Sequence, residues 1–528
     1  MVPEQWRAIS TDLGKSGLTA DEQAKVWHKL IDLGLEKAQL IFLAPDIDVA
    51  LRVLLPGSQE SIATPVPTPV SERDEAAKTL AKKLPAASSY AKQSVWSDPE
   101  YKKLLILMRT HRPSKPGADE LQQLPVALLD KTLGQVEEDC AYATPSAEDV
   151  DFAQELMHVM SGAFPNEQAR MWRLWQMMKR KFSVTFAPLK VANGETDGSL
   201  VVSLDEGLGL YASMEVKQDI GAGDGGDPRL QNCCYATQHY SSELHSDLRW
   251  LSRCPTLLLE LSGPNLSLSG FAFGKHACCD QLSQTVSLLW QPKSELMLGA
   301  PRLVYALRHA LPALQAFYKE LANKPTPDQG QLFFPYPCSY TSPHGPQGFS
   351  YVKRLSDYTF HAVADGPALS ASDLQSAELG PRNLFVKFCK NYSVEAHKAL
   401  QDKGFAPGLL GCERLPGRWL MVIMELLPLA ACTWDDVDTM EKPRDVLRAA
   451  VAALHDARFV HGDLRACNVM VDEQKVYLVD FEWAGKAGEA KYPFYMNRKD
   501  ITWPPGATDN QPITKEHDVF WMEKLLSE

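Results

Sequence analysis

The residues best suited to chemistry lie in the C-terminal third of the chain, within residues 459–483. An apolar stretch leads into His461 and Asp463, and Asn468 follows Asp463 five positions later. A second apolar stretch then ends at Asp480. A carboxylate can orient or deprotonate an attacking hydroxyl group, and an asparagine with a second carboxylate can hold Mg²⁺ against nucleotide phosphates. The pattern therefore predicts phosphoryl transfer.

Several elements must position these side chains. A helix over residues 444–457 is predicted to lead into the first apolar strand, and both aspartates are expected at strand ends that flank one cleft. Upstream, an apolar strand is predicted over residues 383–388, followed by a helix over 393–400. Another apolar strand is predicted over residues 419–426.

The order His461-Gly-Asp463-x-Arg465-x-x-Asn468, followed by Asp480, resembles the catalytic loop and metal-binding segment of the protein-kinase superfamily. The resemblance implies that Asp463 is the catalytic base and that Asn468 and Asp480 bind Mg²⁺. It also implies that His461 orders the loop, and it places Arg465 among the catalytic residues. ATP and Mg²⁺ are the implied cofactors.

The same resemblance implies where the nucleotide binds. Lys387, on the strand over 383–388, would contact the α- and β-phosphates and would be held by Glu395 on the next helix. Backbone groups near Glu425 and Leu426 would meet the adenine edge. A surface lysine and a glutamate stabilised by a helix N-terminus are the alternative explanation for Lys387 and Glu395.

The chain departs from eukaryotic protein kinases in several places. The hairpin expected over the nucleotide, residues 349–364, has no glycine in its turn, and Glu482 replaces the glycine of the usual Asp-Phe-Gly. Too few residues follow Trp483 for a full helical lobe. The His-Gly-Asp form is similar to aminoglycoside- and choline-kinase-like proteins, and further motif details resemble fungal and Crinkler-type kinase-like domains. This resemblance covers residues 345–500, implies a minimal two-lobed domain and leaves the acceptor open.

A second group of charged side chains lies in the middle of the chain. Residues 199–204 and 210–217 alternate like the strands of a hairpin, with Asp197 before the first strand and Glu215 and Lys217 on the second. Asp197 at the start of one strand and Glu215 on the next are expected to share a divalent metal. Lys217, two residues after Glu215, points to the same face and would help to polarise or position the attacking water. A solvated strand face is the alternative.

Predicted helices over residues 166–182 and 227–240 flank this strand pair. The order of helix, strand pair, helix and strand resembles the PD-(D/E)xK, or restriction-endonuclease-like, α/β core. The resemblance implies further ligands at Glu167 and at Gln231 or Gln238, a second Mg²⁺ ion, and DNA as a partner.

Length and composition indicate several domains. A chain of 528 residues with 45% hydrophobic and 23% charged residues is expected to fold as soluble globular domains. Its net charge of −12 gives no global case for nucleic-acid binding. We predict a multidomain α/β and α+β protein with an N-terminal helical segment (1–55), a Pro/Ser/Ala-rich linker (56–95), a nuclease-like domain (96–322) and a kinase-like domain (331–528).

Targeting features and cysteines complete the expectations. The chain has no secretory signal, no apolar run long enough to span a bilayer and no Cys-x-x-Cys, which predicts a cytoplasmic or nuclear protein without a membrane partner. The Crinkler resemblance adds a host cell as an alternative location. The leading hypothesis is an ATP- and Mg²⁺-dependent kinase acting on serine or threonine of a protein substrate. Its rivals are a metal-dependent DNA nuclease with a regulatory kinase-like domain, and a scaffold of two inactive enzyme domains.

Overall fold

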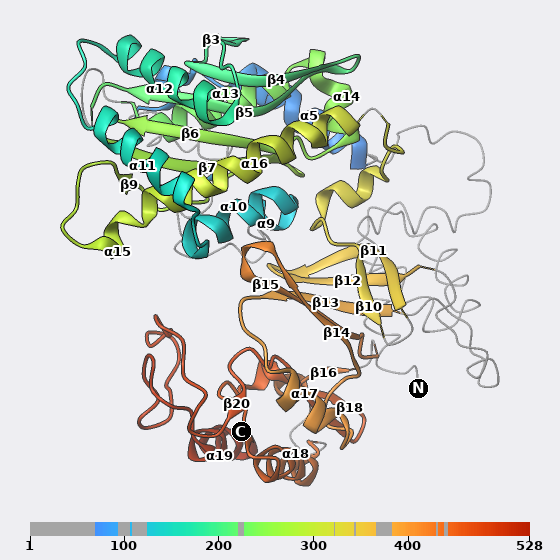
Figure 1. Ribbon diagram of the computed structural model, residues 1–528. Coiled ribbons are helices and arrows are strands. Elements are labelled where there is room, and N and C mark those ends of the chain that lie inside the picture. Colours follow the sequence, from blue (N-terminus) through green and yellow to red (C-terminus); the bar gives the residue numbers. More distant parts are fainter. Residues whose placement is uncertain are drawn as a thin grey trace, which may run out of the picture. The chain divides into compact units, whose positions relative to one another are not determined.

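The computed structural model describes the following parts of the chain: residues 69–92, 106–107, 124–219, 226–321, 323–342, 345–365, 383–428, 431–437 and 442–527 (Figure 1). The predicted helical segment over residues 1–55 lies outside these ranges.

The first half of the described chain contains a seven-stranded mixed sheet built from β1 (Ile106–Leu107), β4 (Gly198–Leu204), β5 (Gly207–Lys217), β6 (Thr256–Ser262), β7 (Asn265–Phe273), β8 (Ala277–Gln281) and β9 (Val286–Ser287). The strand order is β1-β8-β7-β6-β5-β4, with β9 beside β7. Strands β4 and β5 are antiparallel, whereas β5 and β6 are parallel because a helix crosses between them. A separate small hairpin joins β2 (Lys190–Val191) and β3 (Gly194–Glu195).

Ten helices of this half are described: α5 (Pro69–Lys83), α6 (Ala87–Tyr90), α9 (Val126–Leu129), α10 (Lys131–Tyr142), α11 (Ala147–Met160), α12 (Glu167–Phe182), α13 (Pro228–Ser241), α14 (Ser246–Leu251), α15 (Ser294–Met297) and α16 (Gly299–Leu321). Helix α13 packs on β5 and β6, and α16 lies along the sheet (Figure 1). Helix α12 begins after Asn166, whose side chain accepts a hydrogen bond from the backbone of Ala169 at 2.8 Å. The order α12, β4, β5, α13, β6 agrees with the predicted order of elements.

Residues 69–90 correct part of the predicted linker. They form α5 and α6, which pack against α13 with their apolar residues buried. Arg73 on α5 is 3% exposed and donates to the backbone carbonyls of Gly274 (3.0 Å), Ser252 (3.0 Å) and Phe273 (2.6 Å). Alanine, lysine and glutamate favour helix, so the composition of this segment is compatible with a helix as well as with a linker. The buried guanidinium of Arg73 anchors that helix to the α/β half.

The second half contains a six-stranded antiparallel sheet built from β10 (Ser339–Ser342), β11 (Gly345–Ser356), β12 (Thr359–Ala364), β13 (Asn383–Cys389), β14 (Leu409–Leu415) and β15 (Trp419–Glu425). Its strand order is β10-β11-β12-β13-β15-β14. The predicted hairpin and the two predicted apolar strands are confirmed. Thr359 pairs with Lys387, so the β11–β12 turn lies at the lysine end of β13.

Shorter elements complete this half: α17 (Val394–Gln401), β16 (Cys432–Thr433), α18 (Arg444–Asp456), β17 (Phe459–Val460), the 3₁₀ turn η6 (Ala466–Asn468), β18 (Val469–Asp472), β19 (Lys475–Leu478), β20 (Gly485–Lys486) and α19 (Lys515–Ser527). Apolar residues of α17, α18, β18, β19 and α19 share one core. Four other 3₁₀ turns are η1 (Glu243–His245), η2 (Gln329–Phe333), η4 (Pro416–Arg418) and η5 (Trp434–Asp436).

Candidate active site

Asp463 lies in the loop between β17 and η6 and is 8% exposed. The preceding Gly462 has φ +80°, and a Cβ atom there would lie 2.8 Å from the Cδ1 atom of Ile513. A side chain at this position would be both strained and crowded. The glycine therefore sets the direction in which the chain delivers Asp463.

A buried carboxylate that the sequence analysis missed anchors this loop. Asp518 on α19 is fully buried and accepts hydrogen bonds from the backbone N–H groups of His461 (2.8 Å) and Gly462 (2.9 Å). The Nε2 atom of His461 lies 3.0 Å from the carbonyl oxygen of Val479, directly before Asp480. No local spacing marks Asp518, because its partners belong to a distant part of the chain.

Two neighbours orient the carboxylate of Asp463. Arg465 contacts both of its oxygens, with Nη2 at 2.7 Å from Oδ2. The Nδ2 atom of Asn468 donates to the same Oδ2 at 3.0 Å and to the backbone carbonyl of Asp463 at 2.8 Å. The guanidinium of Arg465 also lies over the ring of Trp503, 5.7 Å from its centroid. The structure thus brings together the three loop residues that the sequence singled out.

Lys387 reaches this region from β13. Its Nζ atom lies 2.8 Å from Oδ2 of Asp480 and 2.7 Å from Oε1 of Glu482. Glu395 is exposed on α17, and among the described residues no ion pair joins it to Lys387. The expected partnership of Lys387 and Glu395 is therefore not what the structure shows. Two carboxylates that follow β19 occupy that place.

Burial and charge act in opposite directions in this cleft. Burial alone would lower the pKa of Lys387, but Asp480 and then Glu482 outweigh it and raise that pKa above its usual value. Burial raises the pKa of Glu482, Lys387 opposes this, and Asp480 and Asp463 add to the rise. Asp463 is thus near enough to Glu482 to influence it. Three carboxylates and one lysine share a single electrostatic environment.

The donors fit a magnesium ion that keeps water and substrate ligands. In the part of the chain that the structure describes, no group of three or more His, Cys, Asp or Glu side chains is arranged as a metal site. Mg²⁺ in phosphotransferases is usually held by one or two carboxylates together with water and phosphate oxygens, so fewer protein ligands are enough. Asp480 supplies a carboxylate, and Asn468 presents its carboxamide oxygen because its nitrogen donates to Asp463.

Backbone groups of the segment expected to meet adenine, around Glu425 and Leu426, already form hydrogen bonds within the protein. The N–H of Glu425 donates to Gly408, and the N–H of Leu426 donates to Asn383 at 3.3 Å. A cavity of about 450 Å³ borders these residues, with Tyr477 in its wall. Lys387 and Asp480 do not line this cavity, so adenine contact at Glu425 and Leu426 stays a prediction.

Comparison with known families bears on this segment. A family model described as "RIO1: RIO domain" matches residues 418–502, which include β15, the Asp463 loop and Asp480. RIO domains belong to the atypical protein kinases. Residues 418–502 are kinase-like. For this segment the match supports the expected kinase-like superfamily and a phosphotransferase type of function.

Solved structures similar to the chain include two kinases. The Cydia pomonella granulovirus kinase PK-1 is 13% identical over 34% of this chain and 68% of its own, with a TM-score of 0.27. Vaccinia related kinase 3 is 12% identical over 36% of this chain and 66% of its own, with a TM-score of 0.25. At these TM-scores the likeness decides nothing further. No curated protein is significantly similar in sequence.

The charged residues of the α/β half also come together. The Oε1 atom of Glu215 lies 2.6 Å from Nζ of Lys217, and Glu167 lies 3.9 Å from the same nitrogen. Asp197 accepts a hydrogen bond from the N–H of Val216 at 2.8 Å. Glu215 is 1% exposed, and burial, followed by Asp197, raises its pKa to about 8 despite Lys217. The solvated strand face considered above is therefore wrong for Glu215.

The two glutamines differ. The Nε2 atom of Gln231 lies 3.2 Å from the hydroxyl oxygen of Tyr235. Burial raises the pKa of Tyr235 to about 12, and the nearby Glu215 and Asp197 contribute to this rise. Gln231 is therefore beside the Glu215 group. The Nε2 atom of Gln238 donates instead to the backbone carbonyl of Pro85 at 2.8 Å, and its alternative placement among the ligands stays a prediction.

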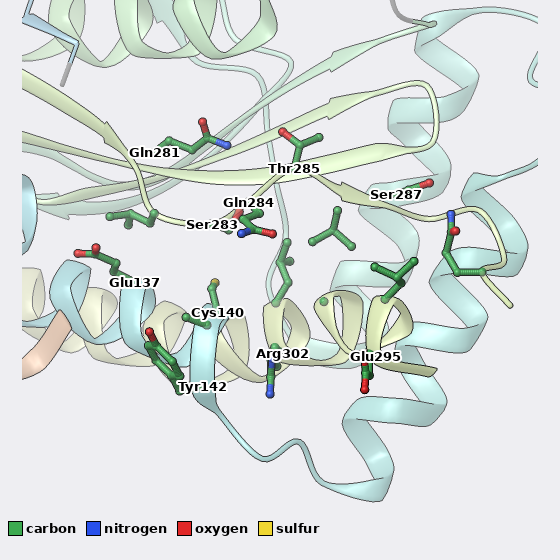
Figure 2. A pocket seen from close by; sticks show the side chains of 17 residues that line it. Glu137, Cys140, Tyr142, Gln281, Ser283, Gln284, Thr285, Ser287, Glu295 and Arg302 are labelled. Atoms are coloured by element: carbon green, nitrogen blue, oxygen red, sulfur yellow. The ribbon is translucent and has the colours of Figure 1, made fainter. Parts of the chain in front are cut away.

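A cavity of about 800 Å³ lies between α10, the β8–β9 connection and the start of α16 (Figure 2). Its labelled walls are mostly neutral polar side chains, such as Gln281 and Thr285, with Glu137, Glu295 and Arg302 at the edges. None of the predicted site residues lines it. Separately, no described helix combines the length and apolar character needed to cross a membrane.

Proposed function

We propose that this chain transfers the γ-phosphoryl group of Mg-ATP to a serine or threonine side chain of a protein. The supporting observation is that Lys387, the Asp463 loop and the Asp480 segment come together from three separate parts of the chain. Lys387 binds Asp480 and Glu482 directly. Val479, directly before Asp480, donates its N–H to the carbonyl of Asn468 at 3.0 Å, and its carbonyl oxygen lies 3.0 Å from Nε2 of His461. Lys387 and Asp463 are largely buried, and buried charged side chains are costly unless they have a task.

Each residue has a defined part in the proposed reaction. Asp463 accepts the proton of the acceptor hydroxyl, and Arg465 and Asn468 hold its carboxylate in place. Lys387 would contact the nucleotide phosphates. Asn468 and Asp480 would hold Mg²⁺, which would supply positive charge for the phosphate oxygens.

The test is transfer of labelled γ-phosphate from Mg-ATP to the protein itself and to a generic protein acceptor. Wild type is compared with Asp480→Ala and with Glu489→Gln, which changes an exposed carboxylate of the same region. Labelling in wild type and Glu489→Gln that disappears in Asp480→Ala supports the proposal. Wild-type labelling no higher than that of Asp480→Ala contradicts it.

The Glu215 group supports a second candidate, a metal-dependent DNA nuclease of the PD-(D/E)xK type. The Oε2 atom of Glu215 is buried without a hydrogen-bond partner among the described residues, although Lys217 binds the other oxygen. An unpaired buried carboxylate oxygen destabilises a fold, and such groups concentrate at functional sites. Asp197 and Glu215 would hold the metal, with Glu167 and Gln231 beside them.

Cleavage of plasmid DNA with Mg²⁺ or Mn²⁺ tests this candidate. Lys217→Ala should abolish cleavage, whereas Glu243→Gln, at an exposed position, should not. Cleavage that persists in Lys217→Ala would come from a contaminant or from another site. If neither transfer nor cleavage is detected, the scaffold alternative is favoured.

The finer family assignment stays part of the proposal. Fungal and Crinkler-type kinase-like domains are suggested by the sequence motifs, as is action in a host cell. A cytoplasmic or nuclear location is likewise proposed from the sequence.

A further inference from the structure

We propose that Glu482 positions Lys387 for the nucleotide phosphates, the task expected of Glu395. The inference rests on the proposed function and assigns a positioning residue within that site. Glu482 occupies the position where eukaryotic protein kinases have glycine, so their pattern assigns no role to a carboxylate here. The structure places this carboxylate 2.7 Å from the Lys387 nitrogen, slightly closer than Asp480 at 2.8 Å.

Asp480 is a poor permanent partner for the lysine. It is also the proposed magnesium ligand, and an ion bound to its carboxylate withdraws negative charge from Lys387. The Lys387 side chain is 12% exposed, so water cannot replace a lost counterion well. Glu482 supplies a second carboxylate that stays with the lysine while Asp480 binds metal.

The backbone after β19 explains why both carboxylates reach one nitrogen. Asp480 has φ +68°, a left-handed conformation that breaks the strand. Phe481 between them is fully buried in the core that α17 and α18 share. With the intervening ring directed into this core, Asp480 and Glu482 are both free to approach Lys387.

Helix α17 is attached to this segment in another way. The ring of His397 stacks on Phe481 with centroids 4.7 Å apart and an interplanar angle of 17°. The N–H of Ser393 donates to the carbonyl of Phe481 at 3.0 Å. These contacts couple α17 to the Asp480 segment without an ion pair from Glu395, which faces outward.

Acylation of Lys387 tests the pairing without any catalysis. Brief treatment with limiting acetic anhydride, followed by mass spectrometry of the Lys387 peptide, reports how far the ion pairs protect the amine. Glu482→Gln removes the carboxylate that lies 2.7 Å from this nitrogen, so acylation should rise about three- to tenfold. Glu489→Gln is the matched control on an exposed carboxylate and should leave acylation unchanged. Equal acylation in wild type and Glu482→Gln overturns the pairing.

Mg-ATP binding, measured by calorimetry, tests the positioning role. Glu482→Gln should weaken binding about tenfold, and Glu482→Asp, which keeps the charge with a shorter reach, should fall between it and wild type. Glu395→Gln is the rival variant, and a loss of binding in it that equals or exceeds that of Glu482→Gln overturns the inference. If Glu482→Gln does not fold, as judged by circular dichroism, Glu482→Asp decides: wild-type acylation and binding in that variant contradict the inference.

The two proposals can fail separately. Wild-type protein that binds Mg-ATP but transfers no phosphate contradicts the proposed transfer, while the role of Glu482 is still judged by binding. Wild-type protein that does not bind Mg-ATP overturns the positioning role, even if acylation supports the ion pair.

Discussion

The kinase-like cleft and the Glu215 group both combine carboxylates with a lysine, but the pairs are built differently. Lys387 binds carboxylates that follow a strand far downstream in the chain, whereas Lys217 binds a glutamate two residues away on its own strand. The first arrangement exists only when the second half of the chain is folded. The second is nearly present in the strand alone.

The two regions also differ in burial. The side chains of Asp480 and Glu482 are each 33% exposed, whereas Glu215 is 1% exposed and has its pKa raised to about 8. Burial and Asp197 therefore favour the protonated form of Glu215 around neutral pH, whereas Asp480 and Glu482 are partly open to solvent. The two regions differ in how far the protein covers their carboxylates.

The largest expected effect is on transfer by Asp463→Asn. This variant keeps the shape of the side chain but cannot accept the acceptor proton, so the transfer rate should fall about 10²- to 10⁴-fold. Mg-ATP binding measured in parallel should change little, because Lys387 and Asp480 are intact. The pH dependence of the unfolding free energy, to which the raised pKa of Glu215 contributes, should not change. A wild-type transfer rate in Asp463→Asn would remove Asp463 from the mechanism.

Asp518→Ala should have the next largest effect. It leaves the N–H groups of His461 and Gly462 without their buried acceptor, which should lower the unfolding free energy of the C-terminal region by about 2–4 kcal/mol. Hydrogen exchange should accelerate in the Asp463 loop but not in β5. Asp445→Ala removes an exposed ion pair with Arg448 and should cost less than about 0.5 kcal/mol. Unchanged exchange in Asp518→Ala would mean that the loop is anchored elsewhere.

Features with local signals were predictable from the sequence. Helix α12 follows its Asn166 cap, the strand pair β4–β5 was recognisable from its local residue pattern, and the Asp463 loop has a short fixed spacing. Glu215 and Lys217 share a strand face for the same reason. In each case the residues that interact are neighbours in the chain, so the pattern contains the contact.

Features set by distant contacts were not predictable. The acceptor role of Asp518, the pairing of Glu482 with Lys387 and the burial of Arg73 each depend on segments far apart in sequence. A single charged residue on a helix or strand has the same local appearance whether it is exposed or buried. Glu395 illustrates the converse, since a helix position that suited an ion pair faces solvent.

The pH dependence of the unfolding free energy should distinguish the Glu215 group from the kinase-like site by a smaller effect. Glu215 and Glu260 both have pKa values raised from 4.5 to about 8, so the folded state binds protons that the unfolded state has released. Stability should therefore fall as pH rises between 6.5 and 8, by up to about 1.4 kcal/mol per pH unit for each carboxyl group. His239, whose pKa burial lowers to about 3, affects stability only below about pH 6.5.

Glu215→Gln should flatten this slope, as measured by denaturant unfolding across the same pH range. Glu489→Gln provides the control, because an exposed carboxylate has no such effect. A slope in Glu215→Gln equal to that of wild type would show that Glu215 is ionised in the folded protein. In that case the contrast between the partly exposed carboxylates beside Lys387 and a buried, protonated Glu215 would be lost.

The smallest effect is expected for Gln238→Ala, which tests the limits of the Glu215 group. The variant removes one hydrogen bond to the carbonyl of Pro85, so stability should fall by about 1 kcal/mol. Because Gln238 is directed toward the α5–α6 segment, the pH slope produced by Glu215 should be the same as in wild type. Gln231→Ala should instead alter that slope, since Gln231 contacts Tyr235 beside Glu215. If Gln238→Ala changes the slope as much as Gln231→Ala does, the electrostatic group extends along α13 farther than the hydrogen bonds indicate.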